Sequence, residues 1–123
     1  MSCHQVILSL ASNRFQTKNL SKARRCLEEV LSDLHFTNEH WTAPINSLRQ
    51  DAYLNQLAKG STKMDEADLN EWLKQTEIRF GRNACKRRLG IVPIDLDILE
   101  FDGIKRHLSD WERPYVKPLL SEL

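Results

Sequence analysis

The sequence predicts a single α+β domain with the element order β-α-β-β-α-β. Three features of its 123 residues indicate this. Short apolar stretches bounded by turn-forming residues are typical of strands, and two longer stretches with apolar residues three and four apart are typical of helices. The length suits one compact unit, so we expect residues 1–123 to form one domain.

The first strand and the first helix are predicted in the first third of the chain. Residues 6–11 (VILSLA) are apolar and rich in β-branched side chains, and they end at the turn-forming pair Ser12-Asn13, which predicts a buried strand. A helix of about 15 residues follows, because apolar side chains then recur three and four residues apart. These side chains are Leu20, Ala23, Leu27, Val30, Leu31 and Leu34.

Two strands and the second helix are predicted next. Residues 36–41 and 53–58 are the strand candidates, joined by a loop through Pro44 and residues 46–47. Asp65 can cap the N-terminus of the second helix, and Gly81 stands where a left-handed residue can end it. The buried stripe of this helix is predicted to be Leu69, Trp72, Leu73, Thr76 and Phe80.

The last strand is predicted over residues 94–101, after a loop over residues 82–93 and before the turn Asp102-Gly103. A short tail follows it. Right-handed crossovers through the two helices then give a ferredoxin-like fold. We expect a four-stranded antiparallel sheet with the helices packed on one face.

Composition argues against several classes of protein. Eighteen Lys and Arg residues against 17 Asp and Glu leave a net charge of +1, whereas nucleic-acid-binding domains usually have a clear basic excess. The longest uncharged apolar run, residues 6–11, is too short to span a bilayer, and no secretory signal is expected at the N-terminus. The three cysteines form no CxxC pair. We therefore expect a cytoplasmic monomer that binds neither nucleic acid nor a membrane.

Asp95 and Asp97 are the first candidates for chemistry. Side chains alternate along a strand, so both carboxylates point to one face, from Cα atoms about 6.5–7 Å apart. Mg²⁺ prefers such oxygen ligands and would remove the repulsion between the two charges. A simple solvated face of the sheet explains the same two residues.

A basic segment stands directly before these aspartates. Residues 78–94 contain no acid, and they carry Arg79, Arg82, Lys86, Arg87 and Arg88. Arginines beside paired carboxylates are the layout expected for a metal-bound phosphate chain, although a solvated loop is equally consistent with the composition. Glu77 could orient one of these arginines or approach the phosphate region, and a surface pair with Lys74 or Arg79 is the alternative.

Several segments resemble the 6-hydroxymethyl-7,8-dihydropterin pyrophosphokinase family, whose members transfer pyrophosphate from ATP to a pterin alcohol in folate biosynthesis. The resemblance covers nearly the whole chain. Its segments are residues 10–13 (LASN), 41–44 (WTAP), 53–55 (YLN), 76–82 (TEIRFGR), 94–99 (IDLDIL) and 113–119 (RPYVKPL). The pieces that contain Glu77 and Asp95 stand at the family's mutual spacing, which makes the match more specific than either piece alone.

The resemblance implies a Mg²⁺-dependent enzyme that binds ATP and a pterin, and it assigns roles to individual residues. Asp95 and Asp97 would hold two Mg²⁺ ions and, with Arg82, would be catalytic. The ATP-binding residues would be Glu77, Arg82, Arg88, Ile98 and Arg113. The pterin-binding residues would be Thr42, Ala43, Pro44, Tyr53, Asn55 and Tyr115.

The chain departs from the family pattern in two places. Leu89 and Val92 stand where the family's R-W-G-P-R-T has a stacking tryptophan and a phosphate-binding arginine. The P-H segment that precedes the final aromatic segment is also missing, and with it a histidine that contacts the nucleotide phosphates. Two functions therefore stay open: a working pyrophosphokinase, or a degenerate relative that binds a pterin or a nucleotide.

Overall fold

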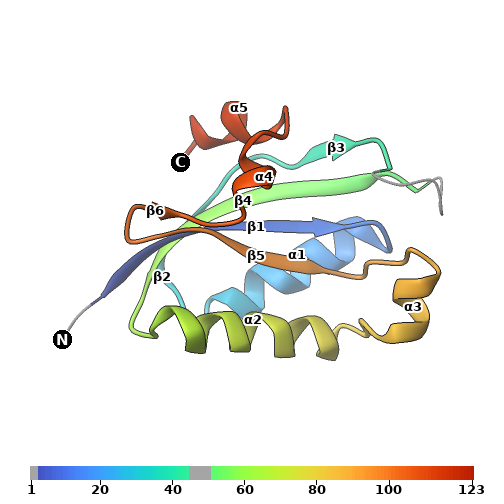
Figure 1. Cartoon of the computed structure of the whole chain (residues 1–123), viewed down its shortest axis with the longest axis horizontal. Helices are drawn as coiled ribbons and strands as arrows, with labels where there is room; N and C mark the ends of the chain where they lie inside the picture. The colour runs from blue at the N-terminus through green and yellow to red at the C-terminus, as the bar shows by residue number, and fades with distance from the viewer. Residues whose placement is uncertain (1–2, 45–50) are drawn as a thin grey trace.

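An antiparallel sheet of six strands forms the centre of the computed structural model, which describes residues 3–44 and 51–123. The strands are ordered β2-β4-β1-β5-β6, and β3 pairs with β4 as well (Figure 1). The elements are β1 (His4–Ser12), α1 (Gln16–Leu27), β2 (Ser32–Phe36), β3 (His40–Thr42), β4 (Tyr53–Thr62), α2 (Glu66–Arg79), α3 (Ala84–Arg88), β5 (Asp95–Phe101), β6 (Ile104–Lys105), α4 (Leu108–Trp111) and α5 (Val116–Leu120). The prediction of an α+β fold with an antiparallel sheet is confirmed.

The prediction of four strands is wrong. The predicted second strand is split into β2 and β3, which lie one after the other along β4. The break occurs at Thr37, whose hydroxyl oxygen accepts the backbone N–H of Leu57 at 3.0 Å in place of a backbone carbonyl. The sixth strand, β6, forms a hairpin with β5 through Asp102 and Gly103, which have φ angles of 49° and 82°.

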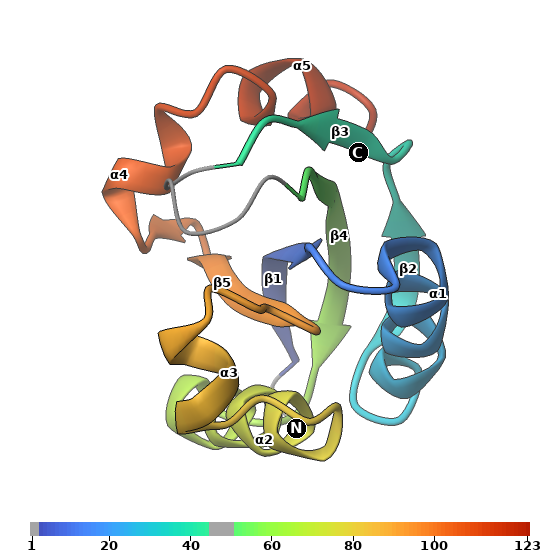
Figure 2. The same cartoon turned by 90° about the vertical axis from the view of Figure 1, so that its right-hand side faces the viewer.

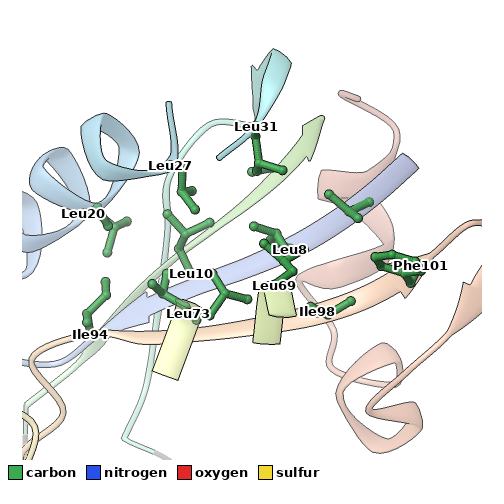
Figure 3. Packing of buried hydrophobic residues seen from close by; sticks show 14 of the residues in the cluster. Leu8, Leu10, Leu20, Leu27, Leu31, Leu69, Leu73, Ile94, Ile98 and Phe101 are labelled. Carbon is green, nitrogen blue, oxygen red and sulfur yellow. The ribbon is translucent and has the colours of Figure 1, made fainter. Parts of the chain in front are cut away.

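One face of the sheet is covered by α1 and α2 (Figures 1 and 2). The alternation along β1 points Val6, Leu8 and Leu10 to this face, where they meet leucines of both helices in the larger hydrophobic core (Figure 3). The predicted first helix ends earlier than expected, because α1 ends at Leu27 and Leu34 belongs to β2. Leu31 still packs in this core from the connection between them.

The opposite face of the sheet is covered by α4 and α5 (Figures 1 and 2). Val116 and Leu119 of α5 pack against Leu57 of β4 and Leu99 of β5 in a second, smaller core. The expectation that helices occupy one face therefore holds for α1 and α2, but the tail adds two short helices on the other face. No helix in the described part of the chain has the length and apolar character needed to cross a bilayer.

The second helix begins and ends where the sequence predicts. The Asp65 carboxylate accepts the backbone N–H of Asp68 at 2.8 Å, and Gly81 has a φ of 99° just after the helix. The loop predicted over residues 82–93 contains the short helix α3, capped by Asn83, whose side chain accepts the N–H of Lys86. The loop predicted through residues 46–47 lies outside the described residues.

Candidate functional site

A cleft of about 190 Å³ lies on the face of the sheet that carries α4 and α5. Neighbouring strands line its floor with Ser9 and Ala11 of β1, Tyr53 and Asn55 of β4, and Asp95 and Asp97 of β5. The tail adds Arg113 and Tyr115, and the segment around α3 adds Arg82 and Val92. The cleft therefore joins residues that are far apart in the sequence.

The alternation along β5 places the two aspartates in the cleft. Leu96 and Ile98 point into the larger core, so Asp95 and Asp97 point the opposite way, with 35% and 16% of their side-chain surface exposed. On β1, Ala11 pairs with Asp95 and Ser9 pairs with Asp97. These two small side chains leave space beside the carboxylates.

Glu77 of α2 adds a third carboxylate to the same cluster. One carboxylate oxygen of each of Glu77, Asp95 and Asp97 lies within 4.8 Å of the others. Glu77 is buried, and its Oε2 accepts the backbone N–H of Leu96 at 2.8 Å, which fixes α2 against β5. Carboxylate oxygens are the ligands that Mg²⁺ prefers, so these residues fit a divalent cation.

Two cations of the chain bridge the carboxylates. Arg82 donates from Nη1 to Glu77 Oε1 at 2.8 Å and to Asp95 Oδ1 at 2.9 Å. Lys74 donates to Glu77 Oε2 and to Asp97 Oδ1, both at 2.9 Å. The three carboxylates therefore face two cations, and the cluster keeps one formal negative charge.

Burial and charge shift the pKa values of several groups in the cleft. Burial and the neighbouring Asp97 raise the pKa of Asp95, although Arg82 and Lys74 oppose the shift. Burial works to lower the pKa of Lys74, but the attraction of Asp97 and Glu77 outweighs it and raises that pKa. Asp95 is therefore the carboxyl of the cleft that burial and a like charge make costly to ionise.

The residues expected to bind a pterin lie at the other end of the cleft. Asn55 is buried, and its side-chain amide donates to Thr42 Oγ1 at 2.8 Å and to the His40 carbonyl at 3.0 Å. Tyr53 and Tyr115 both line the cleft, and burial raises the pKa of each phenol. The Tyr115 ring also stacks on His40, with centroids 6.0 Å apart. Two aromatic rings and an oriented amide thus lie beside the acidic cluster.

The comparison with protein families identifies the kind of protein. The family model for 7,8-dihydro-6-hydroxymethylpterin-pyrophosphokinase (HPPK) matches residues 7–123. The chain belongs to the HPPK family. The resemblance seen in the sequence is therefore confirmed at the level of the family.

Two curated relatives of this HPPK-family chain come from Arabidopsis thaliana. A "Folate synthesis bifunctional protein" is 32% identical over 130 residues, which cover 97% of this chain and 27% of the relative. A "Folate synthesis bifunctional protein, mitochondrial" is 32% identical over 131 residues, which cover 98% of this chain and 23% of the relative. The chain thus spans about a quarter of the length of these relatives. One of them is named mitochondrial, and the cytoplasmic location expected for this chain stays a prediction.

Some residues to which the HPPK resemblance assigns roles lie elsewhere. The Ile98 side chain is buried in the core beneath the sheet, because the alternation points it away from the aspartates, so this side chain cannot line the ATP site. Arg88 is exposed on α3 and is not among the described residues that line the cleft. Ala43 and Pro44 follow β3 and lie outside the described lining too.

The departures from the HPPK pattern have different positions in the structure. Val92 lines the cleft, so the position of the family's phosphate-binding arginine faces the site and carries an apolar side chain here. Leu89 is 54% exposed. The first departure changes the chemistry of the cleft, whereas the second lies on the surface.

Sequence reasoning missed Lys74 and His107 as members of the site. Lys74 was considered only as a surface partner of Glu77, yet it also binds Asp97 of β5. The signal was its position three residues before Glu77, on the same side of the helix. His107 Nε2 lies 3.9 Å from Asp97 Oδ1 at the start of α4, a position that the sequence gave no means to infer.

Proposed function

We propose that residues 1–123 act as a pterin pyrophosphokinase domain that transfers pyrophosphate from ATP to 6-hydroxymethyl-7,8-dihydropterin in folate biosynthesis. The observation that supports it most is the shared cleft. Asp95, Asp97 and Arg82 line it together with Tyr53 and Asn55. Groups suited to a charged phosphate chain therefore adjoin groups suited to a flat, polar heterocycle.

The acidic end of the cleft is proposed to bind the triphosphate. Asp95 and Asp97 would hold two Mg²⁺ ions, which neutralise phosphate charge and orient the displacement when bound. Arg82 binds Glu77 and Asp95, and its rigid position suits a bidentate contact with phosphate oxygens. Glu77 fixes Arg82 in this place, because its carboxylate is itself held by the backbone of Leu96.

The other end of the cleft is proposed to hold the pterin. The Tyr53 and Tyr115 rings offer flat apolar surfaces for stacking. Thr42 and His40 hold the Asn55 amide by its nitrogen, so its oxygen is the group presented for hydrogen bonding to the ring edge. Arg113 lines the cleft between Asp110 and Tyr115 and is proposed to contact a phosphate.

The size of the cleft indicates how a nucleotide would lie. Its volume of about 190 Å³ is below the roughly 300–1,000 Å³ typical of small-molecule sites. Part of the ATP would therefore lie outside the cleft. Arg82 and Val92 line the cleft on either side of α3 in sequence, so the exposed Arg87 and Arg88 of α3 are placed to contact it (Figures 1 and 2).

A second candidate function is a degenerate relative that binds a pterin or a nucleotide and catalyses transfer poorly. The observation that favours it is Val92, which lines the cleft where the family has an arginine. An arginine that stabilises a transferring phosphate contributes about 10³–10⁵ in rate in other phosphoryl transferases. ATP and a pterin are the proposed ligands of the domain in both cases, and we expect a monomer without affinity for nucleic acid.

Assaying the purified protein for AMP tests the proposal. Incubation with ATP, Mg²⁺ and 6-hydroxymethyl-7,8-dihydropterin should produce AMP with wild type and with Glu29→Gln, a surface control on the connection after α1. Asp97→Ala should produce none. Folded wild-type protein that forms no AMP rejects the enzyme, and calorimetry then decides the alternative, since heat from either ligand supports it and heat from neither rejects it.

A further inference from the structure

Lys74 is tied into the acidic cluster by its whole ammonium group. Its Nζ donates to Asp97 Oδ1 and Glu77 Oε2 at 2.9 Å and to the Leu96 carbonyl at 2.8 Å. A lysine ammonium has three donor hydrogens, so these acceptors use all of them. The side chain is 37% exposed, which places the charge at the wall of the cleft and not on the outer surface.

The position of this ammonium conflicts with a divalent cation on Asp97. Mg²⁺ requires oxygen ligands at about 2.0–2.1 Å in a nearly octahedral arrangement. The Asp97 Oδ1 atom already accepts from Lys74, and Glu77 gives one oxygen to Lys74 and the other to Arg82. A metal ion beside Asp97 would therefore meet a positive charge a few ångströms away, and both cations would compete for one carboxylate.

We propose that Lys74 is a built-in counter-ion that competes with Mg²⁺ for Asp97, so that the cleft without nucleotide binds divalent cations weakly. This inference rests on the metal-binding role proposed for Asp97. Ion binding at Asp97 then requires Lys74 to release this carboxylate. The phosphate oxygens of a bound nucleotide are the acceptors that could take over the released ammonium.

A titration with Mn²⁺ alone, followed by the electron paramagnetic resonance signal of the free ion, tests the competition. We expect Lys74→Gln to bind Mn²⁺ at least about tenfold more tightly than wild type, because a like charge close to the ion is removed. Lys18→Gln removes an exposed charge from α1, on the other side of the sheet, and should leave the affinity unchanged. Lys74→Arg keeps the charge and should bind Mn²⁺ as weakly as wild type.

Thermal melts provide a second readout that does not depend on activity. Without divalent cations, Lys74→Gln should melt below wild type, because Asp97 and Glu77 lose a shared partner. Saturating Mg²⁺ should raise the melting temperature of Lys74→Gln more than that of wild type. If Lys74→Gln is unfolded without metal, folding on addition of Mn²⁺ supports the inference, and failure to fold with Mn²⁺ overturns it.

The outcomes separate this inference from the proposed function. Equal Mn²⁺ affinity of wild type and Lys74→Gln overturns the competition and leaves the pyrophosphokinase proposal intact. Equal affinity of Lys74→Arg and Lys74→Gln overturns it as well, because the charge would then not matter. If neither wild type nor Lys74→Gln binds Mn²⁺, even with ATP present, the metal-binding role of Asp97 fails together with the inference.

Discussion

Thr42→Val tests whether the pterin end of the cleft depends on one hydrogen bond between β3 and β4. Valine keeps the shape of threonine and removes the Oγ1 atom that accepts from the Asn55 amide at 2.8 Å. A neutral hydrogen bond contributes about 0.5–1.5 kcal/mol to stability. Asn55 keeps its bond to the His40 carbonyl, so its amide remains partly satisfied and the loss lies at the low end. We expect the free energy of unfolding to fall by about 0.5–1 kcal/mol, which lowers Tm by about 2–6 °C.

The same substitution should weaken pterin binding without affecting the nucleotide. The Asn55 amide is aimed by Thr42, so its oxygen loses a fixed direction when that contact is removed. Calorimetry should show pterin affinity reduced about three- to tenfold, equivalent to roughly 0.6–1.4 kcal/mol, with ATP affinity unchanged. Ala43→Ser, an exposed change on the next residue, is the matched control.

A double-mutant cycle with Asn55→Ala decides the matter. Because the two side chains share the bond, Thr42→Val should cost little further stability once Asn55 has been truncated, and the coupling should be about 0.5–1.5 kcal/mol. Additive effects on stability, or unchanged pterin affinity in Thr42→Val, would refute the reasoning.

Three further predictions concern the acidic end of the cleft. Asp97→Ala should stay folded by circular dichroism and lose Mg²⁺-dependent ATP binding in calorimetry, and unchanged binding would place the metal elsewhere. Val92→Arg should raise the initial rate of AMP formation at least about tenfold, since it restores a phosphate-binding charge in the cleft, and an unchanged rate means that this position does not face the transferred group. The raised pKa of Asp95 means that the folded protein holds this proton more tightly than the unfolded chain, so its contribution to stability is lost as the pH rises above about 4. Asp95→Asn should therefore gain stability relative to wild type in urea titrations as the pH increases from that value, and a difference that does not vary with pH contradicts the argument.

Local periodicity was enough to predict β1, β5 and α2. Their burial follows spacings of two or of three and four residues, and the Asp65 cap of α2 depends on a residue only three positions away. The break between β2 and β3 could not be predicted, because it depends on Thr37 pairing with Leu57, which is distant in the sequence. The helices α4 and α5 are too short to be stable alone and depend on the second core.

The candidate site was predictable to the same extent. Strand alternation alone places Asp95 and Asp97 on one face, and the structure shows them there. Lys74 was missed because its contact with Asp97 depends on how α2 packs across β5, which no local pattern contains. For the same reason, the meeting of Tyr53 with Tyr115 follows from the position of the tail over the sheet.

Arg82 and Lys74 hold the same cluster, yet they differ in how they can respond to a phosphate. Both carboxylate contacts of Arg82 come from its Nη1 group, at 2.8 Å and 2.9 Å. A guanidinium has five N–H donors, so Arg82 can keep Glu77 and Asp95 in place and still donate to a phosphate. Lys74 uses all three of its donors on Asp97, Glu77 and the Leu96 carbonyl, and it can reach a new acceptor only by releasing one of them. Arg82 is therefore the fixed part of the proposed phosphate site, and Lys74 is the part that must move when ligands bind.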